Sequence, residues 1–208
     1  MSLTQQIVER ARKTENGFKD LERAADEVAK THNAAQSREV ALELLRSEFH
    51  QARCVGTFIL GRLAAGDPDA LAVLRECVSR DSDWRVQEIF AKAFDRFCAD
   101  AGYEAALPVI REWLSAPSPN VRRAVTEGLR IWTGRPYFRD HPEVAIELLS
   151  PLRGGDSAYL RKSVGNALRD ISKKHPDLIR REVATWNLDE PSVRHTHKLA
   201  TQFLKASA

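Results

Sequence analysis

The chain contains few of the residues that stabilise small disulfide-bonded or metal-bound proteins. Its 208 residues include 3 cysteines, 10 glycines, 9 prolines and 1 methionine. Cys54, Cys77 and Cys98 form no Cys-x-x-Cys pair and have no Cys/His spacing suited to zinc, so we expect buried, reduced thiols and no metal. With 43% hydrophobic and 29% charged residues, the composition excludes a low-complexity or disordered chain and favours helices.

Long hydrophobic runs are also absent. The longest apolar stretch without a charge, from Cys54 to Gly61, falls far short of the roughly 18 residues that a membrane span needs. The first residues, MSLTQQIVERARK, contain no apolar signal core. We therefore expect a cytoplasmic protein of the bacterial cytosol or nucleoid, with no membrane partner. The length predicts one domain over residues 1–208, and we expect a monomer.

β-Branched alternation is essentially missing, and a 3.6-residue period replaces it. Val40, Leu44 and Leu45 show this period, as do Leu107, Ile110 and Leu114, and it indicates amphipathic helices. Connecting segments rich in Asp, Ser, Pro or Gly separate the helical stretches, several of them ending in a residue suited to cap the next helix. They lie at residues 65–70, 79–83, 115–120, 153–157, 174–177 and 188–192.

One phrase recurs along the chain: an apolar residue, Arg or Gln, a second residue that is usually polar, and then a helix. It begins at Ala52, Val86, Val121, Leu160 and Val193, at intervals of 34, 35, 39 and 33 residues. Such spacing is typical of stacked two-helix repeats. The sequence therefore predicts an all-α fold, a right-handed α–α superhelix of HEAT-like or ARM-like repeats. The central repeats lie at residues 84–98, 120–133 and 159–173.

Aligning the repeats brings polar residues into register on the second helix of each pair. We call this set the polar ladder and expect its members to lie side by side along an inner groove. Trp84 and Trp132 lie at its edges, where indole rings suit a cationic aromatic ligand, although both are also compatible with simple helix packing. Trp113 and Trp186 are predicted core residues. The ladder comprises Glu88, Lys92, Asp95, Arg123, Glu127, Arg130, Lys162, Asn166 and Arg169.

Charge is divided unevenly along the chain. Residues 1–110 contain 15 Lys and Arg against 18 Asp and Glu, whereas residues 111–208 contain 17 against 11. A basic half favours a phosphate backbone as partner. The alternative is that the ladder charges pair with their neighbours and only solubilise the groove or bind a peptide.

The chain resembles DNA alkylation repair proteins of the AlkC/AlkD type, which are HEAT-like-repeat DNA glycosylases. Three segments carry the resemblance: SDWRVQE, NVRRAVTEGLR and YLRKSVGNALRDISKKHPDL. The resemblance runs from about residue 40 to residue 185. It implies that a concave face binds double-stranded DNA containing alkylated bases. It also implies hydrolysis of the N-glycosidic bond of N3- or N7-alkylated purines without metal or cofactor.

Transferred residue by residue, the resemblance gives Glu127 the place of the AlkC-like catalytic carboxylate and Asp170 that of a second acidic residue. Trp84 and Glu88 match the AlkD-like Trp-x-x-x-Asp pair, with Glu in place of Asp. Asn166 stands where the AlkD branch carries a tryptophan, and the AlkC-like aromatic is displaced, here to Trp132. The implied DNA- or lesion-binding residues are Trp84, Arg123, Arg130, Trp132, Lys162, Asn166 and Arg169, with Glu127, Asp170 and Glu88 as catalytic carboxylates.

Two alternatives from the sequence stay open. The first is a relative that binds DNA without releasing bases. The second is a HEAT-type protein scaffold, in which the insertion TGRPYFRDHP at residues 133–142 contacts a partner, because the fold alone does not determine function.

Overall fold

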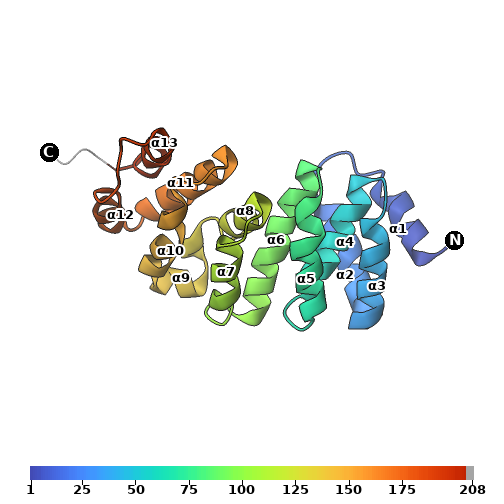
Figure 1. Ribbon diagram of the computed structural model, residues 1–208. Helices are drawn as coiled ribbons and strands as arrows, with labels where there is room; N and C mark the ends of the chain where they lie inside the picture. The colour runs from blue at the N-terminus through green and yellow to red at the C-terminus, as the bar shows by residue number, and fades with distance from the viewer. Residues whose placement is uncertain (205–208) are drawn as a thin grey trace. The chain divides into compact units, whose positions relative to one another are not determined.

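The computed structural model describes residues 1–204 (Figure 1). In this part of the chain, helices are the only regular secondary structure. The predicted all-α fold class is therefore confirmed. By its contacts the chain divides into two compact units, Met1–Gly102 and the part from Tyr103 onward. The single domain expected over residues 1–208 stays a prediction.

The first unit is built around helix α4, which contacts α2, α3, α5 and α6. The apolar run Cys54–Gly61 is buried over its whole length in α4, so the most hydrophobic stretch of the sequence forms the centre of this core. The elements of the unit are α1 (Leu3–Ala11), α2 (Lys19–Thr31), α3 (Ala34–Leu45), α4 (His50–Leu63), α5 (Pro68–Glu76), the short 3₁₀ helix η1 (Val78–Arg80) and α6 (Trp84–Ala101).

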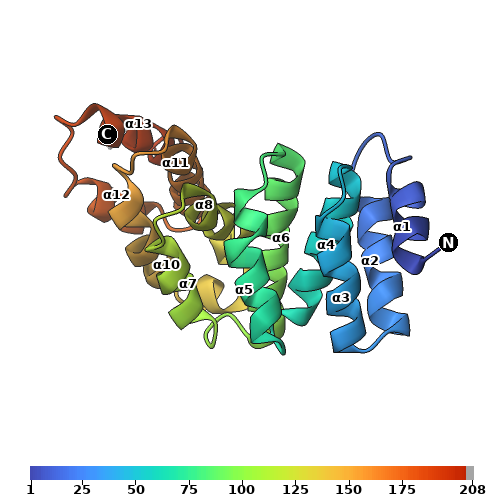
Figure 2. The ribbon, with the colours of Figure 1, turned by 45° about the vertical axis from the view of Figure 1, so that its right-hand side comes forward.

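In the second unit α11 has the central place and contacts α8, α10, α12 and α13. Figure 2 shows α11 beside α8 and α13 from a second direction. The elements are α7 (Leu107–Leu114), α8 (Pro119–Gly128), η2 (Trp132–Gly134), α9 (Pro136–Asp140), α10 (Pro142–Leu149), η3 (Ser150–Leu152), α11 (Ala158–Ser172), α12 (Pro176–Val183) and α13 (Pro191–Ala200).

Many helices begin at the polar residues or prolines that the sequence places before them. Asp67, Asp83 and Ser157 accept backbone hydrogen bonds at the starts of α5, α6 and α11, which satisfies N–H groups that a helix leaves unpaired. Proline occupies the first turn of α8 and α13, where its missing N–H costs nothing. The connectors therefore set the register of the second helices.

Neighbouring second helices approach closely at two glycines. A Cβ on Gly61 would lie 2.7 Å from the Cβ of Ala93, and one on Gly165 would lie 2.7 Å from the Cβ of Leu199. Both distances are too short for a real contact, so α4 with α6, and α11 with α13, pack at a separation that only glycine permits.

The Arg or Gln of the recurring phrase has a structural role. Each of these side chains donates to main-chain carbonyl groups of the connector before its own helix, at 2.6 to 3.1 Å. The second helix is thereby tied to the end of the loop that leads into it, and otherwise unpaired carbonyls are satisfied. The residues are Arg53, Gln87, Arg122, Arg161 and Arg194.

The predicted core tryptophans are confirmed, with Trp113 1% and Trp186 6% exposed. The prediction for the cysteines holds at two of three positions. Cys54 and Cys98 are buried, and burial raises the pKa of the Cys54 thiol to about 12. Cys77 is exposed because it lies where α5 ends, at the surface.

Candidate nucleic-acid interface

Within the second unit, three contacts join α8 and the segment after it to α11. The Arg123 guanidinium lies 5.3 Å from the ring centre of Tyr159. Next, the buried Ser163 hydroxyl donates to Thr126 Oγ1 at 2.7 Å. Last, Arg130 on the α8 side reaches Asp170 of α11, with Nε 3.8 Å from Oδ2. α8 and α11 therefore lie side by side, with Arg123 and Arg130 of the polar ladder at two of the contacts.

The two carboxylates of this face differ in their surroundings. Asp170 is only 7% exposed, and Lys173 Nζ lies 2.8 Å from Oδ1, with Arg130 and Arg169 each at 3.8 Å. Three cations therefore neutralise one buried carboxylate. Glu127 has a side chain 28% exposed and, among the described residues, one long ion pair, 3.8 Å to Arg130 Nη1. Glu127 is therefore the carboxylate that keeps access to a ligand.

Arg130 connects the two acidic residues although it lies outside helix α8. The repeat predicted over residues 120–133 places Arg130 on the same helical face as Glu127, but α8 ends at Gly128. The side chain is 47% exposed and contacts both Glu127 and Asp170. Arg130 therefore makes these contacts from the segment after α8 and not from the helix itself.

A half-exposed ring that the sequence did not reveal lies against two of the cations around Asp170. Phe203, in the turn after α13, is 51% exposed, and its ring centre lies 5.1 Å from Lys173 Nζ and 5.8 Å from the Arg169 guanidinium. Both contacts have cation–π geometry. No repeat or motif marks Phe203, because it follows the last helix and reaches the cluster only through the fold.

The remaining ladder residues of this unit lie on α11. Lys162 is exposed, whereas Asn166 and Arg169 are half-buried. Arg169 Nη1 also lies 3.4 Å from Gln202 Oε1. Lys162 is thus the cation of this helix that is most available to a partner.

Trp132, predicted as a DNA- or lesion-binding residue, needs correction. Its side chain is fully buried and meets Phe138 edge-on, with ring centres 4.8 Å apart. Phe138 belongs to the 133–142 insertion, which folds into α9 and contributes to the core of the unit. Because α8 stops early, the chain turns and directs the indole inward. Trp132 therefore presents no surface to a ligand in this structure.

In the first unit, α6 holds Trp84 and the acidic Glu88 one turn later. Trp84 is 62% exposed, Glu88 is half-buried, and the Arg85 guanidinium lies 5.4 Å from the Trp84 ring centre. Lys92, one turn on, lies 5.2 Å from the ring centre of Phe18. A hollow of about 380 Å³ opens beside them, lined by residues 14–18, Leu21, His50, Gln51, Trp84 and Arg85.

His50 lines this hollow and has a perturbed titration. Burial and the neighbouring Arg85 lower the pKa of His50, and Asp83 opposes them only in part. Arg85 Nη1 lies 2.7 Å from His50 Nε2, and Asp83 Oδ2 lies 3.8 Å from Nδ1. The neutral imidazole is therefore favoured at this position.

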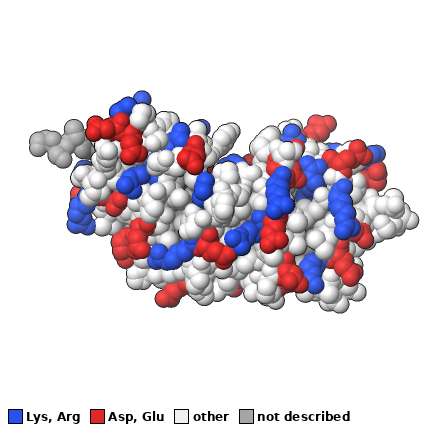
Figure 3. All heavy atoms as spheres, in the orientation of Figure 1, with Lys and Arg blue, Asp and Glu red and all other residues white. Residues whose placement is uncertain are grey.

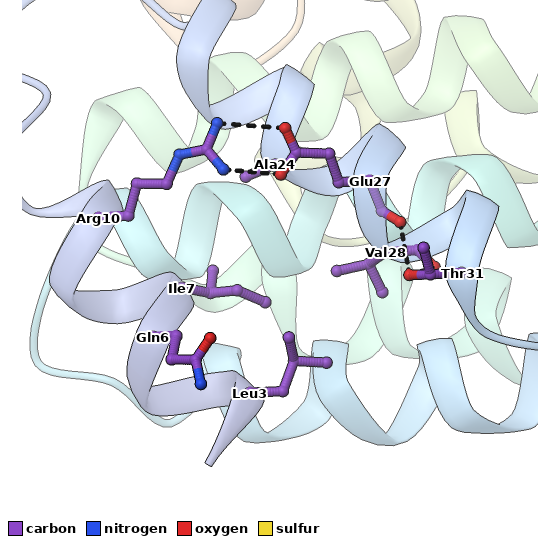
Figure 4. Close-up of a pocket in the computed structure, with 8 residues that line it drawn as sticks. All are labelled: Leu3, Gln6, Ile7, Arg10, Ala24, Glu27, Val28 and Thr31. Carbon is purple, nitrogen blue, oxygen red and sulfur yellow. Dashed lines mark hydrogen bonds and ion pairs between the residues drawn. The ribbon is translucent and has the colours of Figure 1, made fainter. Parts of the chain in front are cut away.

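A second, mainly apolar hollow of about 420 Å³ lies between α1 and α2, and no ladder residue lines it. Figure 4 shows Arg10 and Glu27 joined beside it, with Ile7 and Val28 below. Two hydrogen bonds of 2.7 and 3.2 Å form this pair. On the face seen in Figure 3, basic and acidic side chains are interspersed within each unit, so no single-sign patch stands out there.

Residues 1–204 offer neither a metal cluster nor a membrane-spanning helix. Residues 1–204 contain no cluster of three or more His, Cys, Asp or Glu side chains arranged to hold a metal ion. Over the same residues, none of the helices combines the length and the hydrophobicity that crossing a bilayer requires.

The comparisons with known proteins agree with one another. A family model described as DNA alkylation repair enzyme matches residues 18–205. The crystal structure of AlkD2 from Streptococcus mutans is 43% identical, with a TM-score of 0.95, and the match covers 99% of this chain and 100% of that one. AlkC from Pseudomonas fluorescens, an alkylpurine DNA glycosylase bound to DNA containing an abasic site analogue, is 23% identical over 97% of this chain and 62% of its own. Its TM-score of 0.52 shows a shared fold.

A curated relative is also found, the Bacillus subtilis protein YhaZ, which is described as uncharacterized. It is 31% identical over 103 residues. The match spans 46% of this chain and 29% of the length of YhaZ, so only part of that protein is shared.

Proposed function

From its membership of the DNA alkylation repair enzyme family, we propose that this chain binds duplex DNA and hydrolyses the N-glycosidic bond of cationic N3- or N7-alkylated purines. Its part in DNA repair follows from the family, whereas the reaction is our proposal. The observation that carries it is Glu127, an accessible carboxylate flanked by Arg123 and Arg130 on a face to which α11 adds Lys162.

The chemistry needs one fixed negative charge. In the reaction water attacks C1′ of the deoxyribose, the bond to the purine breaks, and the bond electrons neutralise the departing base. The sugar becomes positively charged on the way, and a carboxylate stabilises that charge and accepts the proton of the water. Because the base is already cationic, it leaves without a general acid. Glu127 fits this role since its only ion pair within residues 1–204 is a long one of 3.8 Å.

Asp170 fits a positioning role better than a catalytic one. It is buried and surrounded by Arg130, Arg169 and Lys173, so its charge is already compensated. In our proposal it holds Arg130 beside Glu127. In the first unit, Trp84 and Glu88 of α6 are an aromatic and an acidic residue one turn apart. We propose that both contact DNA.

The cations of this face would bind phosphates of the DNA backbone. We assign this role to Arg123, Arg130, Lys162 and Arg169, because phosphate contacts position a duplex and carry most non-specific affinity. The structure of AlkC with DNA containing an abasic site analogue supports DNA as the partner. Asn166 would contact DNA as a hydrogen-bonding side chain between Lys162 and Arg169.

The reaction predicts release of free base from methylated DNA. Purified protein should liberate 7-methylguanine or 3-methyladenine from such DNA, and Glu127→Gln should slow this by about 10²- to 10³-fold, the usual cost of losing one electrostatic contact to the transition state. Chromatography of the released bases measures the rate.

The control for this assay is Asp177→Asn, which removes an exposed carboxylate of α12 and should leave the rate unchanged. Release at the wild-type rate by the Glu127→Gln protein would exclude Glu127 as the catalytic carboxylate.

A second candidate is a repair protein that binds DNA without releasing bases. Two observations favour it: Trp132 is buried, and Asn166 stands where the AlkD-like resemblance places a tryptophan. The same assay separates the candidates, since this one predicts salt-dependent binding of duplex DNA and no free base. In the scaffold alternative, buried Phe138 offers no ring to a partner, whereas Arg139 and Asp140 of the same insertion are exposed. This alternative predicts no DNA binding even at low salt.

A further inference from the structure

Tyr159, the second residue of α11, presents a large ring to solvent. It is 71% exposed, more than any other tyrosine, tryptophan or phenylalanine in the part of the chain that the structure describes. Burial therefore does little to keep a ring at this position. The ring nevertheless has a partner, because the Arg123 guanidinium of α8 lies 5.3 Å from its centre, which is cation–π geometry.

Both side chains start from fixed backbone. Ser157 caps the first turn of α11, which holds Tyr159, by accepting a backbone N–H at 3.3 Å. One turn beyond Tyr159, the Ser163 hydroxyl donates across to Thr126 Oγ1 of α8 at 2.7 Å. The approach of Arg123 to Tyr159 is therefore set by two helices that are joined to each other and not by a loop.

Arg123 differs from the other two arginines of the polar ladder in what holds it. Arg130 and Arg169 each approach the Asp170 carboxylate at 3.8 Å. Arg123 has no ion pair with any of the described residues, and its Nε is buried without a hydrogen-bond partner. The Tyr159 ring therefore takes the place that a carboxylate has at the other two arginines.

A ring and a carboxylate leave an arginine in different states. A carboxylate occupies N–H donors of the guanidinium and neutralises its charge, whereas the face of a ring attracts the cation without accepting those donors. Arg123 therefore keeps its charge and the flat fork of donors that matches a phosphate with two hydrogen bonds. Because the ring already orders the side chain, less conformational freedom is lost when a ligand binds.

We propose that Tyr159 is a positioning residue for DNA binding. Its ring holds the Arg123 guanidinium in the orientation that binds one phosphate of the DNA backbone through two hydrogen bonds. Tyr159 acts through Arg123 and not on a base, so its contribution to affinity is the same for any duplex sequence. This inference rests on the proposed function and adds to it the group that orients one phosphate contact.

The positioning role predicts a loss of affinity without a loss of charge. Tyr159→Leu should weaken binding of an undamaged duplex about two- to fivefold, the contribution of an exposed cation–π contact. The dependence of affinity on salt should keep its slope, because the charge of Arg123 remains. Arg123→Ala should weaken binding and also make the slope shallower by about 1. Fluorescence anisotropy of a labelled duplex, titrated at several salt concentrations, measures both quantities.

Two further proteins separate positioning from support of the fold. In an Arg123→Ala background, Tyr159→Leu should weaken binding no further, because the cation that the ring orients is gone. Tyr159→Phe keeps the ring and should restore wild-type affinity. The matched control is Tyr137→Leu on α9. The Tyr137 ring lies against Phe138 and His141 and against no Lys or Arg of the described residues, so its loss should leave affinity and slope unchanged.

Three results would overturn the positioning role and leave DNA binding itself standing. These are a Tyr159→Leu protein that binds as tightly as wild type, an equal loss from Tyr159→Leu with and without Arg123, and a Tyr159→Phe protein as weak as Tyr159→Leu. Failure of the wild-type protein to bind the duplex even at low salt would overturn the proposed function and this inference together.

Discussion

At the scale of single residues, His50 shows how burial and charge combine. Its ring lies between Arg85 and Asp83 near the start of α6, and burial together with Arg85 lowers its pKa. In the folded protein the imidazole therefore resists protonation more than it does in the unfolded chain.

This shift sets the sign of a pH effect. The unfolded chain binds a proton at His50 at higher pH than the folded chain, so the stability contribution of His50 is fully present above its usual pKa of about 6.5. It is lost as the pH falls through the lowered value. Urea unfolding at neutral and mildly acidic pH should show this loss. In His50→Gln the loss should be smaller, and an unchanged pH dependence would contradict the assignment.

Some residues could be assigned from the sequence and others could not. Trp113 and Trp186 follow a helical apolar face and were predicted to be buried. The burial of Trp132 was not predictable, because the run RRAVTEGLRIW keeps a helical period beyond Gly128. The helix nonetheless stops there, since Arg135 binds the Gly128 carbonyl and turns the next residues out of register. That interaction joins residues seven apart and has no periodic signature.

At the scale of elements, the recurring phrase identified the second helices correctly. It did not distinguish its two polar positions. The Arg or Gln fixes the preceding loop, as Arg161 does on the Gly155 and Asp156 carbonyls, whereas the next position holds the ladder residues Glu88, Arg123 and Lys162. Sequence repeats reveal both positions because each recurs, but recurrence alone does not tell a structural arginine from a functional lysine.

Two adjacent residues of α11 test this division. Arg161→Ala should lower the free energy of unfolding by about 1–3 kcal/mol, because two loop carbonyls lose their donor. Lys162→Ala should leave stability within about 0.5 kcal/mol and weaken DNA binding instead. Urea titration and a DNA-binding assay measure the two effects. Equal destabilisation by both changes would refute the assignment.

At the scale of the whole molecule, the sequence shows an uneven distribution of charge. The excess of Lys and Arg lies in residues 111–208, which include the α8 and α11 face. How the two compact units arise could not be predicted, because the helical period runs through both halves of the chain without a break.

The charge distribution predicts how affinity for DNA depends on salt. With Arg123, Arg130, Lys162 and Arg169 on phosphates, the logarithm of the affinity should fall with the logarithm of the salt concentration with a slope of about −3 to −4. Lys162→Ala should make the slope shallower by about 1. Lys30→Ala on α2, an exposed lysine of the first unit, should leave it unchanged. An affinity independent of salt would rule out the phosphate contacts.

The distribution of the tryptophans gives the molecule a built-in optical reporter. Trp84 is the only tryptophan of the first unit and is 62% exposed, while Trp113, Trp132 and Trp186 of the second unit are buried. Emission from Trp84 is therefore expected at longer wavelength and open to quenching by iodide, and emission from the other three is shielded. A single spectrum can follow ligand contact at α6 and loss of the core of the second unit as separate signals.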